Sequence, residues 1–271
     1  KYLAETRNFE GTVICIFQPA EEGGGGGKEM VDDGLMDRWG VQEVYGMHNM
    51  PGIPVGHFAI REGSIMAAAD TIEITVTGKG GHAAKPHDCV DTTVVAAHII
   101  VALQTIASRN VDPLKQVVVS VCSVVTDSPA HNVIPQTVVL KGTVRTLDAA
   151  VQDQVERRIH EIAQGTALAL GARAVVDYQR GYPVTVNAPE NTAYAVKVAQ
   201  DVSGQVNADT PPLMRLEGFS YMLNERPGAY IFLGNGDTAM VHHPAYNFDD
   251  NAIPFGASWY AGMAEARMPA G

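Results

Sequence analysis

The sequence predicts an α/β protein in which a smaller domain is inserted into a larger one. A continuous apolar run at 12–17 is typical of a buried strand in a parallel sheet, and it ends at Pro19. The middle of the chain instead shows strands with alternating polarity, and α/β character returns after Pro183. The 271 residues are long for one hydrophobic core and comfortable for two domains.

The larger domain is expected at 1–65 and 182–271. Its first part holds the run at 12–17 and a second strand at 43–48. Its second part predicts two helices around one buried strand, at 190–202, 229–233 and 251–267.

The inserted domain is expected at 66–181, with the order βαββαβ of a ferredoxin-like module. Strict alternation at 70–78 predicts a half-exposed strand, and helical spacing at 149–171 predicts a helix ended by Gly171. The remaining elements are expected at 90–109 (helix), 116–125 and 137–147 (strands) and 172–178 (last strand).

Composition and charge exclude several classes of protein. The net charge of −11 disfavours nucleic acid as a partner, because an acidic surface repels phosphates. No apolar run approaches the roughly 20 residues that cross a bilayer, so we expect no membrane span. No charged-then-apolar leader is visible. Three scattered cysteines disfavour a disulfide framework and fit a reducing cytoplasm, and Cys15 and Cys122 are expected in the core.

Two adjacent carboxylates, Glu21 and Glu22, follow the first predicted strand and precede five glycines at 23–27. Open α/β sheets bind ligands at such strand ends. Neighbouring carboxylates repel, so both stay ionised only beside a positive charge, and a divalent cation supplies it. One acid can then bind the metal while the other accepts a proton from water. A solvated acidic loop with a flexible glycine turn is the alternative interpretation.

Histidines in two further segments extend this hypothesis. His48 lies at the end of the predicted strand 43–48, and the neighbours His242 and His243 lie in the loop that follows 229–233. One glutamate and two histidines from these segments would suit Zn²⁺, Mn²⁺ or a similar ion. A strand-end histidine bonded to the backbone is the simpler alternative for His48.

Three polar residues of the inserted domain are candidates for substrate contacts: His82, Asn132 and Arg145. Each can donate hydrogen bonds to a carbonyl or carboxylate. Taken singly, each also suits a turn, a cap or a surface charge. The chain has no G-x-S-x-G elbow, no phosphate loop and no H-E-x-x-H helix.

Together these segments resemble a known family, the dinuclear-metal amidohydrolases of the hippurate hydrolase and indoleacetyl-amino-acid hydrolase type (subfamily D of metallopeptidase family 20). The matching segments run in the family's order and cover nearly the whole chain: QPAEEGGGGG, VYGMHNMPG, GKGGHAAKPH, HNVIP, GTVRT and VHHPAYNFDD. The resemblance implies a metal-binding α/β catalytic domain with an inserted ferredoxin-like lid that also forms a homodimer. It also implies hydrolysis of the amide bond of N-acyl amino acids or small peptides.

The resemblance also implies roles for single residues. Glu21 matches the general base, and His82 matches a lid histidine that stabilises the tetrahedral intermediate in a partner subunit's site. The matching ligands of two divalent metals, Zn or Mn with Co and Ni also compatible, are Glu22, His48 and His242. The matching substrate-binding residues are Asn132 and Arg145.

Two departures from the family pattern lead to a rival hypothesis. The family's Cys-Gly-His-Asp-Gly-His block, which supplies further ligands, is absent, so the catalytic domain is expected to be N-terminally incomplete. Gly218 stands where the family's Gly-Gly-Glu-Asp-Phe-Ser motif has its Asp, although Glu217 is retained. The rival is a truncated or degenerate, non-catalytic homologue that acts as a dimerisation or ligand-binding module.

Overall fold

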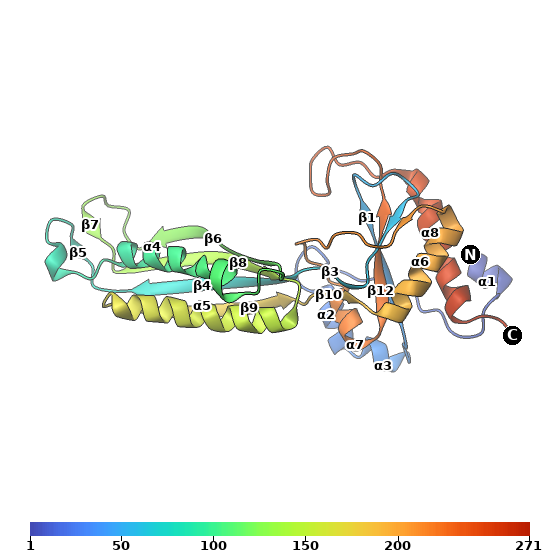
Figure 1. Ribbon diagram of the computed structural model, residues 1–271, viewed down its shortest axis with the longest axis horizontal. Helices are drawn as coiled ribbons and strands as arrows, with labels where there is room; N and C mark the ends of the chain where they lie inside the picture. Colours follow the sequence, from blue (N-terminus) through green and yellow to red (C-terminus); the bar gives the residue numbers. More distant parts are fainter. The chain divides into compact units, whose positions relative to one another are not determined.

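The computed structural model describes all 271 residues, which form two compact units. Unit 1 comprises Lys1–Met66, Thr185–Leu213 and Glu217–Gly271, and unit 2 comprises Ala67–Val184 and Met214–Leu216. Figure 1 labels the helices and strands of both units.

Unit 1 is built on a four-stranded mixed sheet of order β1-β12-β2-β11. Strand β1 lies at one edge and pairs in parallel with β12, and β2 runs antiparallel to β12 on the other side. A separate antiparallel pair joins β3 to β10. The elements of unit 1 are α1 (Tyr2–Thr6), α2 (Gly26–Asp32), α3 (Leu35–Arg38), β1 (Val44–Met50), β2 (Phe58–Ala59), β3 (Gly63–Met66), β10 (Thr185–Asn187), α6 (Pro189–Ser203), β11 (Val206–Asn207), α7 (Ser220–Glu225), β12 (Gly228–Gly234), η3 (Asp250–Ala252) and α8 (Ile253–Arg267).

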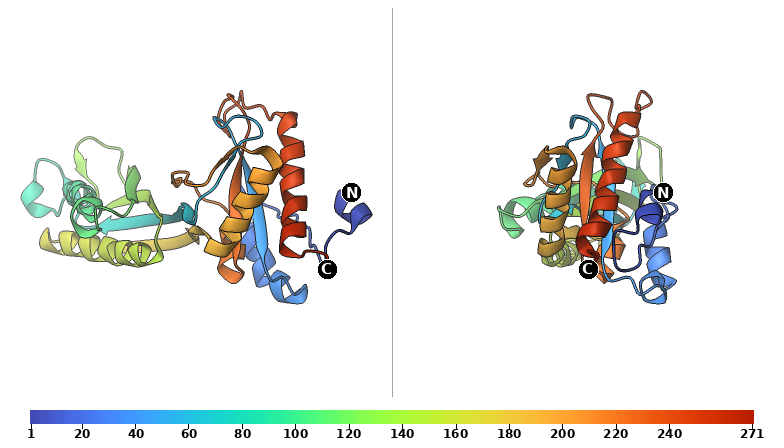
Figure 2. Two further views of the ribbon diagram at one scale, coloured as in Figure 1. Left: turned by 45° about the vertical axis from the view of Figure 1, so that its right-hand side comes forward. Right: turned by 90° about the vertical axis from the view of Figure 1, so that its right-hand side faces the viewer.

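Strand β12 lies at the centre of unit 1, and every one of its residues is buried, as predicted for a strand covered on both faces. Ile231 belongs to the apolar cluster that contains Trp259 of α8 and several residues of α6. Tyr230 and Phe232 point to the opposite face and belong to the cluster that includes residues of α2, α3 and α7. Figure 2 shows α6 and α8 side by side against the sheet.

The prediction of a buried strand at 12–17 is wrong. Residues 11–20 form no strand in the structure, although the chain there is apolar. Ile14 and Ile16 pack against unit 1, whereas Val13 is 39% exposed and Phe17 is 89% exposed. The apolar run indicates a preference for β structure. A buried strand also needs neighbouring strands to pair with, and no strand pairs with this segment.

The cysteine prediction also fails in part. All three cysteines are free, but Cys15 and Cys122 are exposed rather than buried. Cys15 lies on the outward side of the unpaired segment described above. Cys122 lies on the strand 117–126, at the register shift between Val121 and Ser123. There the pairing with the strand 137–146 skips a residue.

Unit 2 has the predicted βαββαβ order. Its sheet is antiparallel throughout, with the order β6-β8-β4-β9 of a ferredoxin-like fold. A short antiparallel pair, β5 with β7, lies beyond the end of the sheet (Figure 1). The elements of unit 2 are β4 (Ala68–Thr77), β5 (Gly81–His82), η1 (Pro86–Asp88), α4 (Thr92–Leu103), η2 (Ile106–Asn110), β6 (Val117–Thr126), β7 (Val133–Ile134), β8 (Thr137–Thr146), α5 (Ala149–Ala169) and β9 (Arg173–Tyr182).

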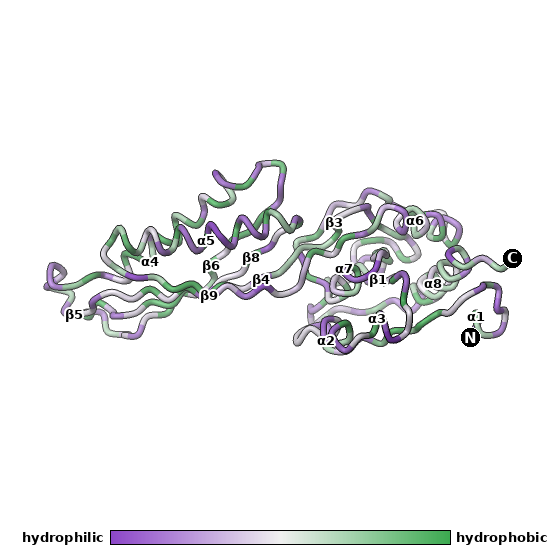
Figure 3. The backbone as a smooth tube through the Cα atoms, turned by 90° about the horizontal axis from the view of Figure 1, so that it is seen from below, coloured by the Kyte–Doolittle hydropathy of each residue, from purple (hydrophilic) through white to green (hydrophobic).

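The two helices of unit 2 begin at aspartate caps. Asp91 accepts hydrogen bonds from the first backbone N–H groups of α4, and Asp148 does the same for α5. Gly171 adopts a left-handed conformation (φ 80°) just after α5, as predicted. In Figure 3 hydrophilic and hydrophobic stretches alternate along α5, as expected for a helix with one buried face.

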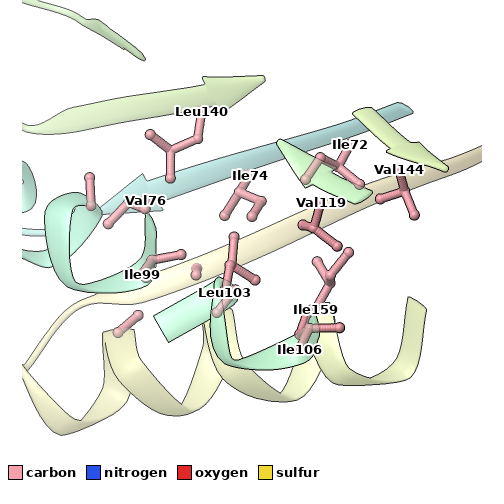
Figure 4. Packing of buried hydrophobic residues seen from close by; sticks show 14 of the residues in the cluster. Ile72, Ile74, Val76, Ile99, Leu103, Ile106, Val119, Leu140, Val144 and Ile159 are labelled. Carbon is pink, nitrogen blue, oxygen red and sulfur yellow. The ribbon is translucent and has the colours of Figure 1, made fainter. Parts of the chain in front are cut away.

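Both helices bury apolar side chains against one face of the sheet (Figure 4). The central members of this core include Ile72, Ile74, Ile99, Leu103, Leu140 and Ile159. Unit 2 therefore has a hydrophobic core of its own, separate from the two clusters of unit 1.

One helical stretch corrects the expectation that no apolar run approaches membrane-spanning length. Thr92–Asn110 is long and apolar enough to cross a membrane by length and composition, with a mean hydropathy of 1.3. In the structure its residues Ile99, Leu103 and Ile106 are fully buried in the core of unit 2. The core helix of a globular domain meets the same criterion.

The C-terminal helix of unit 1 is tied to the sheet by an ion pair that should depend on pH. Arg267 Nε donates to Glu43 at 2.9 Å, and this hydrogen bond lowers the pKa of Glu43. The pair therefore stabilises unit 1 above about pH 4.3, the usual pKa of Glu, and this contribution is lost as the pH falls through the lowered pKa.

We therefore expect Glu43→Gln to lower the melting temperature at pH 7 and to have a smaller effect at pH 3. Thermal unfolding of both proteins, followed by circular dichroism from pH 3 to 7, measures the difference. A difference that does not change with pH would show that the ion pair contributes nothing.

Candidate metal and catalytic site

The Glu21–Glu22 pair lies in a tight turn between the extended segment and helix α2. Ala20, Gly24 and Gly25 all have positive φ (50°, 104° and 65°). A side chain at Gly26 would come within 1.8 Å of the Pro19 carbonyl oxygen, so the backbone approaches closely there. The glycine run is therefore part of a compact turn that fixes where the two carboxylates lie.

Glu22 faces His242 across unit 1. The Glu22 Oε2 and His242 Nε2 atoms are 3.5 Å apart, although the residues are 220 positions apart in the sequence. Both side chains are exposed, by 76% and 68%. His242 has a positive φ of 69°, unusual for a residue with a side chain. The structure thus brings together two of the three predicted ligands, with open space around their polar atoms.

The loop that carries His242 is anchored at its ends by amide side chains. Asn235, buried just after β12, donates to the Asn247 carbonyl at 2.9 Å and accepts from the Asp249 backbone N–H at 2.9 Å. Asn49, next to His48 on β1, donates to the Tyr246 hydroxyl. These bonds connect the loop to the ends of two neighbouring parallel strands, β1 and β12.

The third predicted ligand, His48, lies on β1. Its Nδ1 is 2.5 Å from the Asn49 carbonyl oxygen, which can only accept, so Nδ1 carries the proton. The other nitrogen, Nε2, is then free to bind a cation. His48 also acts electrostatically on Glu21, where it lowers the pKa.

Glu21 is the group whose protonation the site alters. Burial raises the pKa of the Glu21 carboxyl, and the charges of Glu217 and Glu22 raise it further. A hydrogen bond from the Gly218 backbone and the charge of His48 act in the opposite direction. A carboxylate with a raised pKa is a better proton acceptor, as a general base requires.

Sequence reasoning missed Glu217 and Tyr230 as parts of this site. Glu217 is 4% exposed and Tyr230 is 4% exposed, and the Tyr230 hydroxyl donates to the Glu217 carboxylate. The signal available in the sequence was the retained acid before Gly218. No sequence pattern indicated Tyr230, which reads only as part of a buried strand.

The remaining three candidates belong to unit 2 and fall into two groups. His82 on β5 and Asn132 beside β7 are neighbours, because the Ala83 backbone N–H donates to the Asn132 carbonyl at 3.1 Å. Arg145 lies near the end of β8, opposite Ala69 at the start of β4. His82 follows the far end of β4, so the length of that strand, roughly 25–30 Å, separates the two groups.

The donor atoms of these side chains are of types that bind a divalent cation, but they do not form a complete coordination shell. Carboxylate and imidazole are the ligands that zinc and manganese accept. No group of three or more His, Cys, Asp or Glu side chains in the chain is arranged to hold a metal ion. The structure therefore pairs Glu22 with His242, and His48 lies close enough to Glu21 to act on it electrostatically.

The chain is similar to proteins of a known family. The sequence matches the peptidase family M20/M25/M40 over residues 1–266. It is 38% identical to hippurate hydrolase of Campylobacter jejuni, over 97% of this chain and 69% of that protein. It is 38% identical to N-acetyl-L-cysteine deacetylase of Bacillus subtilis, over 91% of this chain and 58% of that protein.

A solved structure shares the fold. The YxeP protein of Bacillus subtilis, described as a dinuclear metal-binding peptidase from the M20 family, superposes with a TM-score of 0.83 at 29% identity. The match covers 98% of this chain and 68% of that one.

The fold and the sequence match thus assign the chain to a class of peptidases. The chain belongs to peptidase family M20/M25/M40. It spans 69% of the length of the hippurate hydrolase and 58% of the length of the N-acetyl-L-cysteine deacetylase named above.

The Glu22–His242 pair yields a direct test. We expect His242→Ala and Glu22→Gln each to weaken Mn²⁺ or Zn²⁺ binding by at least about tenfold, because each removes a donor atom. Isothermal titration calorimetry measures the affinity. His98→Ala, which changes an exposed helix histidine of unit 2, is the matched control and should bind as the unaltered protein does. Equal affinities in all four proteins would remove the pair from metal binding.

Proposed function

We propose that the protein is a metal-dependent amidohydrolase that cleaves the amide bond of N-acyl amino acids or small peptides. The observation that carries this proposal is the convergence of Glu22 and His242 beside Glu21, whose pKa is raised. Family membership and the names of the relatives support the substrate class. A cytoplasmic location belongs to the same proposal.

Glu22, His48 and His242 would hold the metal in this chain, as part of a dinuclear set. When bound, the metal would polarise the substrate carbonyl and acidify water, since a divalent cation acts as a Lewis acid. Glu21 would accept a proton from the attacking water and return it to the leaving amine. Its turn, fixed by glycines, holds the carboxylate in place for this role.

Unit 2 would act as the lid and dimerisation domain. His82 would donate to the developing oxyanion, while Asn132 and Arg145 would hold the substrate's carbonyl and carboxylate. His82 and Asn132 lie at the end of unit 2 opposite the start of β4, where the chain enters the unit. We therefore propose that these two residues serve the site of a second copy of the chain.

The exposed apolar side chains of unit 2 support this dimer. Strand β6 is an edge of the sheet, so its outer backbone groups are free to pair. Apolar side chains are exposed on both β6 and the neighbouring helix α4: Val118, Val124, Val125, Val94 and Val101. A second copy that covers this apolar edge would bury them, as homodimer interfaces do.

A non-catalytic module is the second candidate. The absence of a three-residue metal group favours it. Metal analysis of the purified protein and an assay with N-benzoylglycine separate the two candidates. An amidohydrolase retains bound metal and hydrolyses this substrate. A protein with neither metal nor activity would be the module.

The proposed general base is tested by Glu21→Gln. We expect this change to lower kcat for N-benzoylglycine by at least about 100-fold, because it removes the proposed proton acceptor. Metal content should persist, since Glu22 remains. Glycine release measures the rate, and Glu29→Gln, an exposed glutamate on helix α2, is the matched control. A kcat that survives in Glu21→Gln would exclude Glu21 as the base.

The proposed dimer is tested by Val101→Asp. Val101 is 71% exposed, so the change should leave the fold of one chain intact. An unpaired charge buried at the interface should weaken dimerisation by about 100-fold or more. Sedimentation equilibrium measures the association, with Leu168→Asp on helix α5 as the control (78% exposed). Unaltered protein that sediments as a monomer would overturn the dimer, as would a dimer that tolerates Val101→Asp.

A further inference from the structure

Glu217 is a buried carboxylate whose partners are all neutral. Only 4% of the residue is exposed. The Phe219 backbone N–H donates to its Oε1 at 2.9 Å, and the Tyr230 hydroxyl donates to its Oε2. Because both oxygens accept, this pattern suits an ionised carboxylate. No ion pair in the chain includes Glu217.

A buried charge without a cationic partner is costly, so its location needs an explanation. Glu217 lies close enough to Glu21 for its charge to raise the pKa of that carboxyl. Only burial has a larger effect on this pKa. With Glu22, three carboxylates then gather in one part of unit 1. Their mutual repulsion is relieved when a divalent cation binds beside them.

Glu217 also connects the centre of the sheet to the turn that holds Glu21 and Glu22. On one side its carboxylate accepts from Tyr230 of β12, which is itself buried. On the other side the Gly218 carbonyl oxygen lies 2.6 Å from where a side chain at Gly27 would begin, so the two backbones touch. The Gly218 backbone also forms a hydrogen bond with Glu21.

We propose that Glu217 is a positioning residue of the cation site. Its buried negative charge strengthens the attraction of a divalent cation to Glu21 and Glu22, and its two hydrogen bonds hold the Gly218 turn against them. Glu217 need not touch the cation, because a charge in a buried, low-dielectric environment acts over several ångströms. This inference rests on the proposed function and deepens it.

Titration of the metal-free protein with Mn²⁺ tests the proposal. We expect Glu217→Gln to raise the Kd for Mn²⁺ by about tenfold or more, because it removes the charge at nearly constant shape. Glu217→Asp, which keeps the charge, should recover most of the affinity. Asp70→Asn is the matched control: Asp70 is also a buried carboxylate (1% exposed), and it also accepts from a tyrosine, Tyr178, at 2.6 Å, but it belongs to unit 2.

The outcomes separate this inference from the proposed function. Equal Kd values for Glu217→Gln and the unaltered protein would overturn it, and so would equal losses in Glu217→Gln and Glu217→Asp. If Glu217→Gln fails to fold, Tyr230→Phe decides: a weaker affinity supports the proposal and an unchanged one overturns it. If the unaltered protein binds no Mn²⁺, the proposed function fails and this inference falls with it.

Discussion

Repulsion between neighbouring carboxylates is the constraint that shapes unit 1. Glu21 and Glu22 are consecutive in the sequence, and the charge of Glu217 acts on Glu21 from a buried position. Left to themselves, such groups move apart or take up protons. The glycine turn and the anchored His242 loop instead hold them near imidazoles. The fold thus maintains an arrangement whose electrostatic balance improves when a cation binds.

Much of this architecture could be predicted because it depends on local patterns. The alternating strand at 70–78, the capped helix before Gly171 and the buried strand around Ile231 all appear where the sequence indicates. Predicted strand ends also indicate that Glu22 and His242 lie close together, and they do, although the strand expected before Glu22 does not form. Hydrophobic periodicity, together with the residues that end helices and strands, indicates these elements within a single segment of sequence.

What could not be predicted depends on neighbours in space. The run at 12–17 has strand character, but its burial depends on partners that the sequence pattern does not specify. Cys122 lies in an apolar run typical of a core strand, but it is exposed at the register shift in β6. The role of Tyr230 in holding Glu217 is invisible in the sequence, because the two residues meet only after β12 and the Gly218 turn pack together.

The place where unit 2 joins the rest of the chain has a consequence for how the protein can change. Its first and last long strands, β4 and β9, are neighbours in the sheet, with Ala69 opposite Tyr182. Adjacent strands are about 4.8 Å apart, so the entry and exit of this 118-residue stretch (Ala67–Val184) are close together. A short peptide can bridge that gap with little loss of chain entropy. The inserted stretch therefore enters and leaves through adjacent strands, so that unit 1 keeps the strand pairing of its own sheet.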